Sequence, residues 1–121
     1  MNTKGTGRAG EDAAANFLLK KGYRIVERNY NCSIAEIDIV AYNSNGVLCF
    51  CEVKTRKSKQ YGCAYEAVNA DKMHQLRKGA ISFVTHHGLD CEMQIDVIEV
   101  YGDFLNGKFE VFQIEHYENV F

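Results

Sequence analysis

Two neighbouring segments joined by a short turn constrain the fold of this chain more than any other feature of its sequence. Residues 34–42 alternate between apolar and polar side chains, and residues 47–54 open on an apolar run. Between them lies the turn Asn43-Ser-Asn-Gly46. Because Asn-Gly between two strand patterns is a strong hairpin signal, the two segments are predicted to pair as antiparallel strands.

This hairpin gathers charged side chains on one patch of sheet. The period of two places Glu36 and Asp38 on one face of the first strand, with Ile37 and Ile39 on the other. In the second strand, Glu52 and Lys54 share a face, and antiparallel pairing can bring Asp38 close to Glu52.

Two carboxylates side by side cost stability unless something binds between them. Mg²⁺ commonly uses one or two carboxylates together with substrate phosphates. A lysine such as Lys54 beside the metal can help to place a water nucleophile and offset charge on a phosphodiester. The alternative is a solvent-facing sheet on which Glu52 and Lys54 form a simple ion pair.

Two further charges stand at unexpected positions of predicted helices. Glu11 falls inside the apolar arc of a helix over residues 8–21, between Ala15 and Leu18, where a carboxylate needs a partner. A helix packed on the sheet would aim it at the same patch, although a carboxylate near a helix start is also favoured by the helix dipole. Lys72 opposes the dipole of the second helix, which a docked phosphate would explain.

The remaining pattern predicts one α/β domain over residues 1–121, built on a single mixed sheet flanked by helices. The predicted order of helices and strands is αβββαββ. In chain order we expect a flexible arm over 1–7, a helix over 8–21, strands over 23–30, 34–42 and 47–54, a helix of about 17 residues ending at Gly88, and strands over 93–101 and 108–116.

Charge and cysteine content narrow the class of protein. Residues 1–89 carry 13 Lys and Arg against 8 Asp and Glu, whereas residues 90–121 carry 1 against 8. The basic stretch over 54–78 is either a phosphate-binding surface or an ordinary solvated face. No apolar run approaches the roughly 20 residues of a membrane span, and five cysteines without a CxxC pair favour a reduced, cytoplasmic compartment.

Four stretches of this sequence resemble the YraN-like family of small bacterial proteins, which is similar to archaeal Holliday-junction resolvases. The four stretches are Gly7-Arg-Ala-Gly-Glu11-Asp-Ala-Ala, Gly22-Tyr-Arg-Ile-Val-Glu-Arg-Asn-Tyr30, Ala35-Glu-Ile-Asp38-Ile-Val and Phe50-Cys-Glu-Val-Lys-Thr-Arg56. Shorter matches to the same family are Tyr61-Gly62, Glu66-Ala-Val68, Lys72 and Ile95-Asp-Val97.

The resemblance implies a restriction-endonuclease-like fold and a metal-dependent endonuclease that hydrolyses DNA, including branched or Holliday-junction DNA. Asp38 and Glu52 would hold Mg²⁺ or Mn²⁺ with the Val53 carbonyl as a third ligand, and Lys54 would act on the water or the phosphate. Glu11 would bind a second metal or orient the water. Glu36 would act on the metal ligands without binding the metal itself. The residues expected to contact phosphates are Arg8, Arg56, Lys57, Lys59 and Lys72.

Cutting two strands symmetrically would further imply a homodimer, and no membrane partner is expected. The alternative from another class is a non-catalytic nucleic-acid-binding or assembly protein that retains the nuclease fold. The intact set of Glu11, Asp38, Glu52 and Lys54 argues against a loss of catalysis. A plain interaction module is a third alternative, and it leaves the carboxylates unexplained.

Overall fold

The computed structural model of the chain describes residues 3–57 and 70–120, with side chains from residue 7 onward. Its elements confirm the predicted α/β class and the order αβββαββ. They are α1 (Thr3–Lys20), β1 (Arg24–Asn31), β2 (Glu36–Tyr42), β3 (Leu48–Arg56), α2 (Ala70–His86), β4 (Met93–Leu105) and β5 (Lys108–Tyr117).

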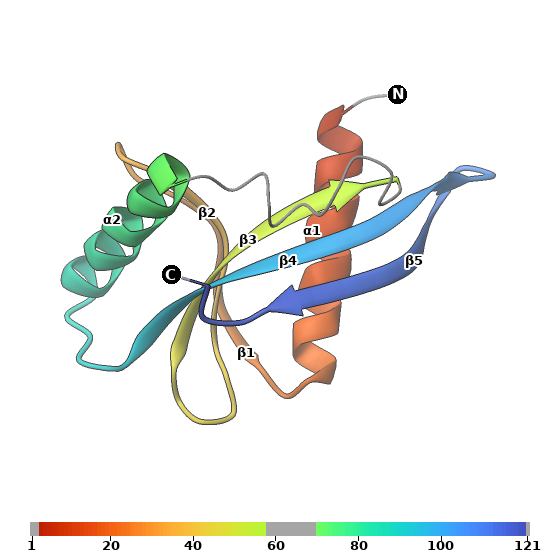
Figure 1. Cartoon of the computed structure of the whole chain (residues 1–121). Coiled ribbons are helices and arrows are strands. Elements are labelled where there is room, and N and C mark those ends of the chain that lie inside the picture. The colour runs from red at the N-terminus through yellow and green to blue at the C-terminus, as the bar shows by residue number, and fades with distance from the viewer. Residues whose placement is uncertain (1–2, 58–69, 121) are drawn as a thin grey trace.

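The five strands form one mixed sheet in the order β1-β2-β3-β4-β5. All neighbouring pairs are antiparallel except β3 and β4, which are parallel and are connected through α2. The two helices lie on opposite faces of the sheet, so β3 in its middle is covered on both sides (Figure 1). Within the described residues, neither helix is both long and apolar enough to span a membrane.

The face under α1 is a core of small and medium side chains. Ala14 and Leu18 of α1 are fully buried against Ile39 of β2, and Cys49 and Cys51 of β3 lie in the same cluster. Both cysteines therefore occupy the sheet face opposite Glu52, as the alternation of β3 predicts. Leu19, next to the buried Leu18, is 53% exposed because it lies beyond the edge of the stripe that faces the sheet.

The face under α2 is built around an aromatic side chain of that helix. Phe83 is fully buried, and its ring packs edge-on against Phe50 at 5.7 Å and against Tyr30 at 5.0 Å. Met73 and Leu76 complete the buried face of α2. Val84 is only half-buried beside them.

Two side chains of β2 that were predicted on the same face of the sheet, Ile37 and Ile39, lie on opposite faces. Ile39 packs under α1, whereas Ile37 packs under α2. The opposing strand carries Asn29 with a left-handed backbone (φ 55°), between Arg28, which pairs with Ile39, and Tyr30, which pairs with Ile37. A left-handed residue inside a strand locally turns the chain, so Asp38 sits at the point where β2 twists.

The first helix begins at Thr3, so residues 3–7 are helical where an arm was predicted. Its close packing on β3 depends on Gly10. A Cβ at Gly10 would lie 1.8 Å from the Thr55 Oγ1 atom and 2.8 Å from the Thr55 Cβ. Only a glycine lets the helix backbone approach β3 this closely, and this contact positions the adjacent Glu11.

We expect Gly10→Ala to destabilise the protein by about 1–3 kcal/mol, because α1 must move away from the β-branched Thr55. Gly7→Ala is the matched control in the same helix. A Cβ there would meet no atom within 4 Å, so alanine should be neutral or stabilise by up to about 1 kcal/mol. Urea unfolding measures both, and equal stabilities of the two variants would contradict the proposed close contact.

Candidate functional site

The predicted carboxylate patch lies where β2 and β3 separate. The ladder between these strands runs from the Tyr42–Leu48 pair to the Ile39–Cys51 pair, whereas β3 stays paired with β4 as far as Arg56. Beyond the Ile39–Cys51 pair the two strands diverge (Figure 1). The β2 side of β3 therefore lacks strand partners there, and its backbone groups need other partners.

The Asp38 side chain supplies one of these partners. Its Oδ2 atom accepts a hydrogen bond from the Val53 N–H at 2.7 Å. Because Val53 directly follows Glu52, this bond holds the Asp38 carboxylate beside Glu52 at the point of divergence. The structure thus brings together the two carboxylates that the hairpin predicted as neighbours.

Glu52 is a nearly buried carboxylate with two lysines on one of its oxygens. It is 5% exposed, and its Oε1 atom lies 3.3 Å from the Lys54 Nζ and 3.8 Å from the Lys72 Nζ. Lys54 comes from the same strand, and Lys72 comes from the first turn of α2. Lys72, predicted to contact a phosphate, therefore stands directly at the carboxylate pair.

Burial and repulsion raise the pKa of Asp38 to about 7, far above the ordinary value of an aspartate. Loss of hydration is the main cause, and the neighbouring Glu52 charge is the second. The Val53 N–H partly opposes the shift, while Glu11 and Glu36 add to it. A cation between the carboxylates would remove this electrostatic cost.

Glu11 belongs to the same electrostatic group. Burial raises its pKa first, the Arg28 guanidinium lowers it, and the charges of Glu36 and Glu52 raise it further. Glu36 is itself exposed. The four predicted carboxylates therefore influence one another, with the half-buried Asp38 and the buried Glu52 at the centre and Glu11 and Glu36 at the solvent side.

The oxygen donors of this site fit a hard divalent cation. Asp38 and Glu52 supply two carboxylates beside an open edge of β3, and Mg²⁺ or Mn²⁺ needs only one or two of these when a substrate phosphate completes the coordination. Glu11 does not complete a tight triad with them. Of the residues described, only Asp96, His116 and Glu118 place three His, Cys, Asp or Glu ligand atoms all within 4.8 Å of one another.

That second group is already satisfied by hydrogen bonds. The His116 Nε2 lies 2.8 Å from the Asp96 Oδ2, and the Lys21 ammonium lies 2.9 Å from the His116 Nδ1. Since lysine can only donate, the Nδ1 accepts from Lys21 and the Nε2–H donates to Asp96. The other Asp96 oxygen accepts from Gln94 and from the Asn119 N–H. The group could hold a metal by geometry, but its contacts already tie the end of α1 to β4 and β5.

Sequence reasoning missed Arg28, which faces a groove next to Glu11. Its Nη2 donates to the Asp12 Oδ1 at 2.7 Å, and its Nε is buried without a partner in the described structure. The groove has a volume of about 640 Å³, and its lining includes Arg8, Glu11 and Glu36. The asparagine at position 29 is the sequence feature next to Arg28 that indicates an irregular strand. Asparagine tolerates the left-handed backbone conformation that Asn29 adopts in the structure.

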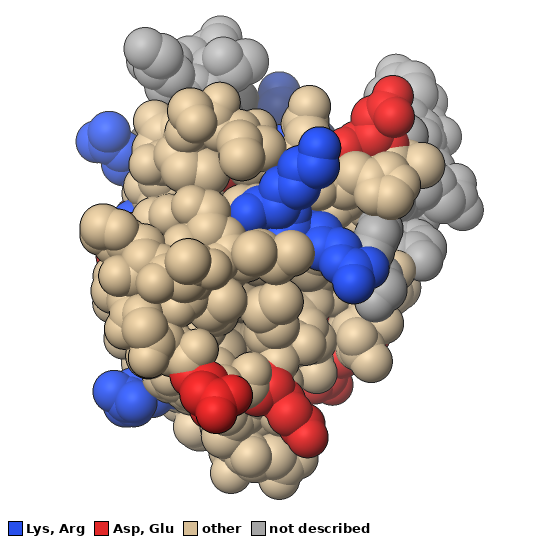
Figure 2. All heavy atoms as spheres, turned by 90° about the vertical axis from the view of Figure 1, so that its left-hand side faces the viewer, with Lys and Arg blue, Asp and Glu red and all other residues tan. Residues whose placement is uncertain are grey.

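The other cations predicted to contact phosphates are spread over one end of the sheet. Arg8 lies exposed at the groove, and Arg56 is half-buried at the end of β3. Lys57 is exposed and lies 4.0 Å from the Asp103 carboxylate, while Lys59 lies outside the described residues. On the face that carries α2, further Lys and Arg side chains gather near the middle, away from the Asp and Glu side chains at the lower edge (Figure 2).

Comparisons with known proteins match most of the chain to one protein family. The model of the family described as "Uncharacterised protein family UPF0102" matches residues 10–100, which include Glu11, Asp38, Glu52 and Lys54. A UPF0102 protein of Caldicellulosiruptor saccharolyticus is 39% identical over 100% of both chains. One from Trichlorobacter lovleyi is 45% identical over 78% of this chain and 75% of its own.

Among solved structures, the chain is similar to Pyrococcus furiosus SfsA in complex with Ca²⁺. The sequence identity is 15%, and the TM-score is 0.43. The match covers 93% of this chain but only 64% of the SfsA chain.

The raised pKa of Asp38 predicts a pH-dependent stability in the absence of metal. Between its ordinary pKa of 3.8 and about 7, the unfolded chain releases the proton while the folded chain keeps it. The free energy of unfolding should therefore fall by about 2–4 kcal/mol as the pH rises from 5 to 8.

Asp38→Asn should remove most of this fall, since a neutral amide cannot ionise. Asp90→Asn, at an exposed position, should behave like the original protein. Urea unfolding with EDTA at the two pH values measures the effect, and an unchanged pH dependence in Asp38→Asn would show that Asp38 is ionised in the folded protein.

Proposed function

The chain belongs to the uncharacterised protein family UPF0102, and from its site we propose that it is a metal-dependent endonuclease that hydrolyses phosphodiester bonds in DNA. The observation that carries this proposal is the pair of the half-buried Asp38 and the buried Glu52 at the open edge of β3, with Lys54 on the Glu52 carboxylate. Carboxylates held together against their own repulsion, with an ammonium beside them, match the needs of metal-assisted phosphodiester hydrolysis.

Each residue has a chemical task in this proposal. Asp38 and Glu52 would hold Mg²⁺ or Mn²⁺, with the Val53 carbonyl as a further ligand, and the metal would polarise the phosphate and lower the pKa of a bound water. Lys54 would orient the attacking water or stabilise the charge on the phosphate. The oxygen of the attacking water would bond to phosphorus and give up a proton to solvent, one P–O ester bond would break, and the leaving oxygen would take up a proton from solvent.

Glu11 would orient the water or hold a second metal from the solvent side. Glu36 would influence Glu11 through its charge without binding the metal itself. Lys72 would contact a substrate phosphate in this proposal, because a metal held by Glu52 would compete with the Lys72 ammonium for that carboxylate. Arg8 and Arg56 would contact phosphates on either side of the cleaved bond. The restriction-endonuclease-like fold is a common frame for such a site, and cutting both strands of a branched DNA would require a homodimer.

Two substitutions separate metal binding from catalysis. Asp38→Asn should weaken Mn²⁺ binding, so that its cleavage defect is partly relieved by more Mn²⁺. Lys54→Ala keeps both carboxylates but loses a charge that stabilises the transition state, so its rate should fall by about 10²–10³ at every Mn²⁺ concentration. A cleavage panel of junction, flap, nicked and linear DNA, together with Mn²⁺ titration by calorimetry, measures both effects.

Asp96→Asn is the matched control for metal binding, since it alters the other group of ligand residues. It should lower stability but leave the affinity for Mn²⁺ unchanged. If the original protein binds DNA but cleaves none of these substrates with Mg²⁺ or Mn²⁺, the non-catalytic nucleic-acid-binding function replaces the nuclease.

The basic residues should govern how DNA binding depends on salt. Replacing Arg56, Lys57 and Lys59 with Ala should reduce the slope of log affinity against log salt by about 0.9 for each phosphate that the protein no longer neutralises. The control removes three exposed cations elsewhere, Lys20, Arg24 and Lys108, and should leave the slope nearly unchanged. Equal slopes for the two triple variants would show that the predicted cations form an ordinary solvated surface.

A further inference from the structure

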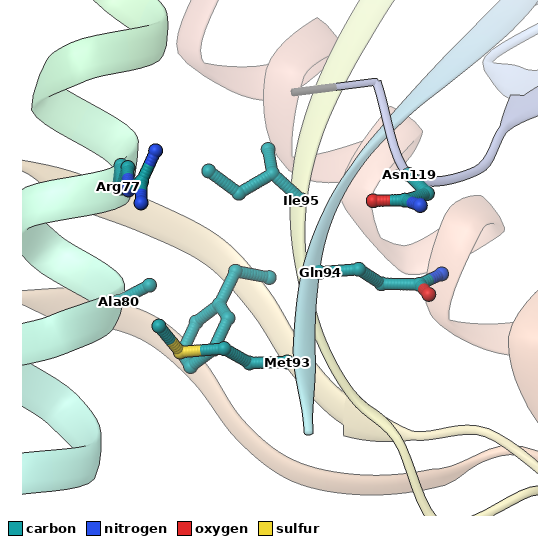
Figure 3. A pocket seen from close by; sticks show the side chains of 7 residues that line it. Arg77, Ala80, Met93, Gln94, Ile95 and Asn119 are labelled. Atoms are coloured by element: carbon teal, nitrogen blue, oxygen red, sulfur yellow. The ribbon is translucent and has the colours of Figure 1, made fainter.

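A small cavity lies between α2 and the beginning of β4. Its volume is about 180 Å³, and its apolar walls are Phe50, Ala80, Met93 and Ile95. The side chain of Arg77 reaches over it from α2 (Figure 3). Two other lining residues, Gln94 and Asn119, lie on the far side of β4 from Arg77 in the same view.

This cavity adjoins the carboxylate site on the same face of the sheet. Phe50 precedes Glu52 by two residues, which is about 7 Å along β3. Ile95 pairs with Phe50, and Val97 pairs with Glu52, so cavity and carboxylate occupy successive rows of the same two strands. One sugar spans a similar distance between a phosphate and its own base.

The volume selects a single ring. An apolar cavity of about 150 Å³ is sufficient to hold a benzene molecule. At about 180 Å³ the cavity therefore has room for the six-membered ring of a pyrimidine base and is close in size to such a single ring.

The lining suits a base more than an aliphatic group. Met93 places its sulfur at the cavity, and sulfur makes favourable contacts with aromatic rings. The Arg77 guanidinium can stack on a flat ring, which is a common way to hold an unstacked base. Arg77 and Lys78 are exposed on α2, and their positive charge attracts a phosphate backbone.

We propose that this cavity receives an unpaired pyrimidine base. This base lies next to the phosphate that would bind the metal held by Asp38 and Glu52. The inference rests on the proposed nuclease function and names its substrate class as DNA with an unpaired pyrimidine beside the cleavage point. A paired base cannot enter, because it must first leave the helical stack. Selection of branched or distorted DNA follows from this requirement.

The test follows the base itself by ¹⁹F NMR, with EDTA present so that the DNA stays intact. The probe is a duplex that carries one unpaired 5-fluorouracil, and the comparison is the same duplex with this base paired to adenine. The protein should shift the resonance of the unpaired base only, and it should bind the unpaired probe about tenfold more tightly. A duplex with one unpaired purine should show no such preference.

Two substitutions should abolish the shift and the tenfold preference. Ala80→Leu fills the cavity, and Arg77→Gln removes the stacking cation. Their controls are Thr85→Leu, which adds the same side chain at an exposed position of α2, and Lys78→Gln, which removes the neighbouring exposed cation. Both controls should keep the preference, although Lys78→Gln should weaken binding to all probes equally.

The outcomes separate this inference from the proposed function. An unshifted resonance, or the same shift in Arg77→Gln as in the original protein, overturns the base-binding cavity even if DNA is cleaved. A shifted resonance without metal-dependent cleavage of any substrate supports the cavity and overturns the nuclease. If Ala80→Leu does not fold, as judged by circular dichroism, the pair of Arg77→Gln and Lys78→Gln decides.

Discussion

The central position of β3 is the constraint on which the rest of the structure depends. This strand pairs antiparallel with β2 and parallel with β4, and a helix covers each of its faces. Its first residues are therefore apolar and buried, while its polar residues Glu52 and Lys54 stand at the end where β2 leaves it. Gly10 brings α1 onto the same end, at Thr55. One strand thus positions the core, the carboxylates and the helix that carries Glu11.

The site has an electrostatic cost that the fold tolerates. Asp38 and Glu52 are held beside each other with little hydration, and the raised pKa of Asp38 expresses the resulting repulsion. Lys54 and Lys72 offset part of the Glu52 charge, and Arg28 offsets part of the Glu11 charge. The protein is less stable with these carboxylates than it would be with apolar side chains in their place. Charged groups kept at such a cost are typical of binding and catalytic sites.

The cavity and Glu52 occupy successive rows of β3 and β4 on the face of the sheet under α2. The rows of β3 and β4 change from apolar at Phe50 and Ile95 to polar at Glu52 over a single pleat. A nucleotide has the same division, with an apolar ring at one end and a charged phosphate at the other. The Asp96–His116 group lies in the other layer and ties the end of α1 to the sheet, so it supports the fold without entering this surface.

The sequence by itself determined the order of the elements and the identity of the charged residues, because both depend on local periods and turn residues. The hairpin at Asn43–Gly46 is local, and it made Asp38 and Glu52 predictable neighbours. Only the tertiary structure decided the face of Ile37, the contact of Lys72 with Glu52 and the place of Arg28. The face of Ile37 depends on a left-handed residue in the opposing strand. The positions of Lys72 and Arg28 depend on contacts between elements that are distant in the chain. The period of side chains along one element gives no information about such contacts.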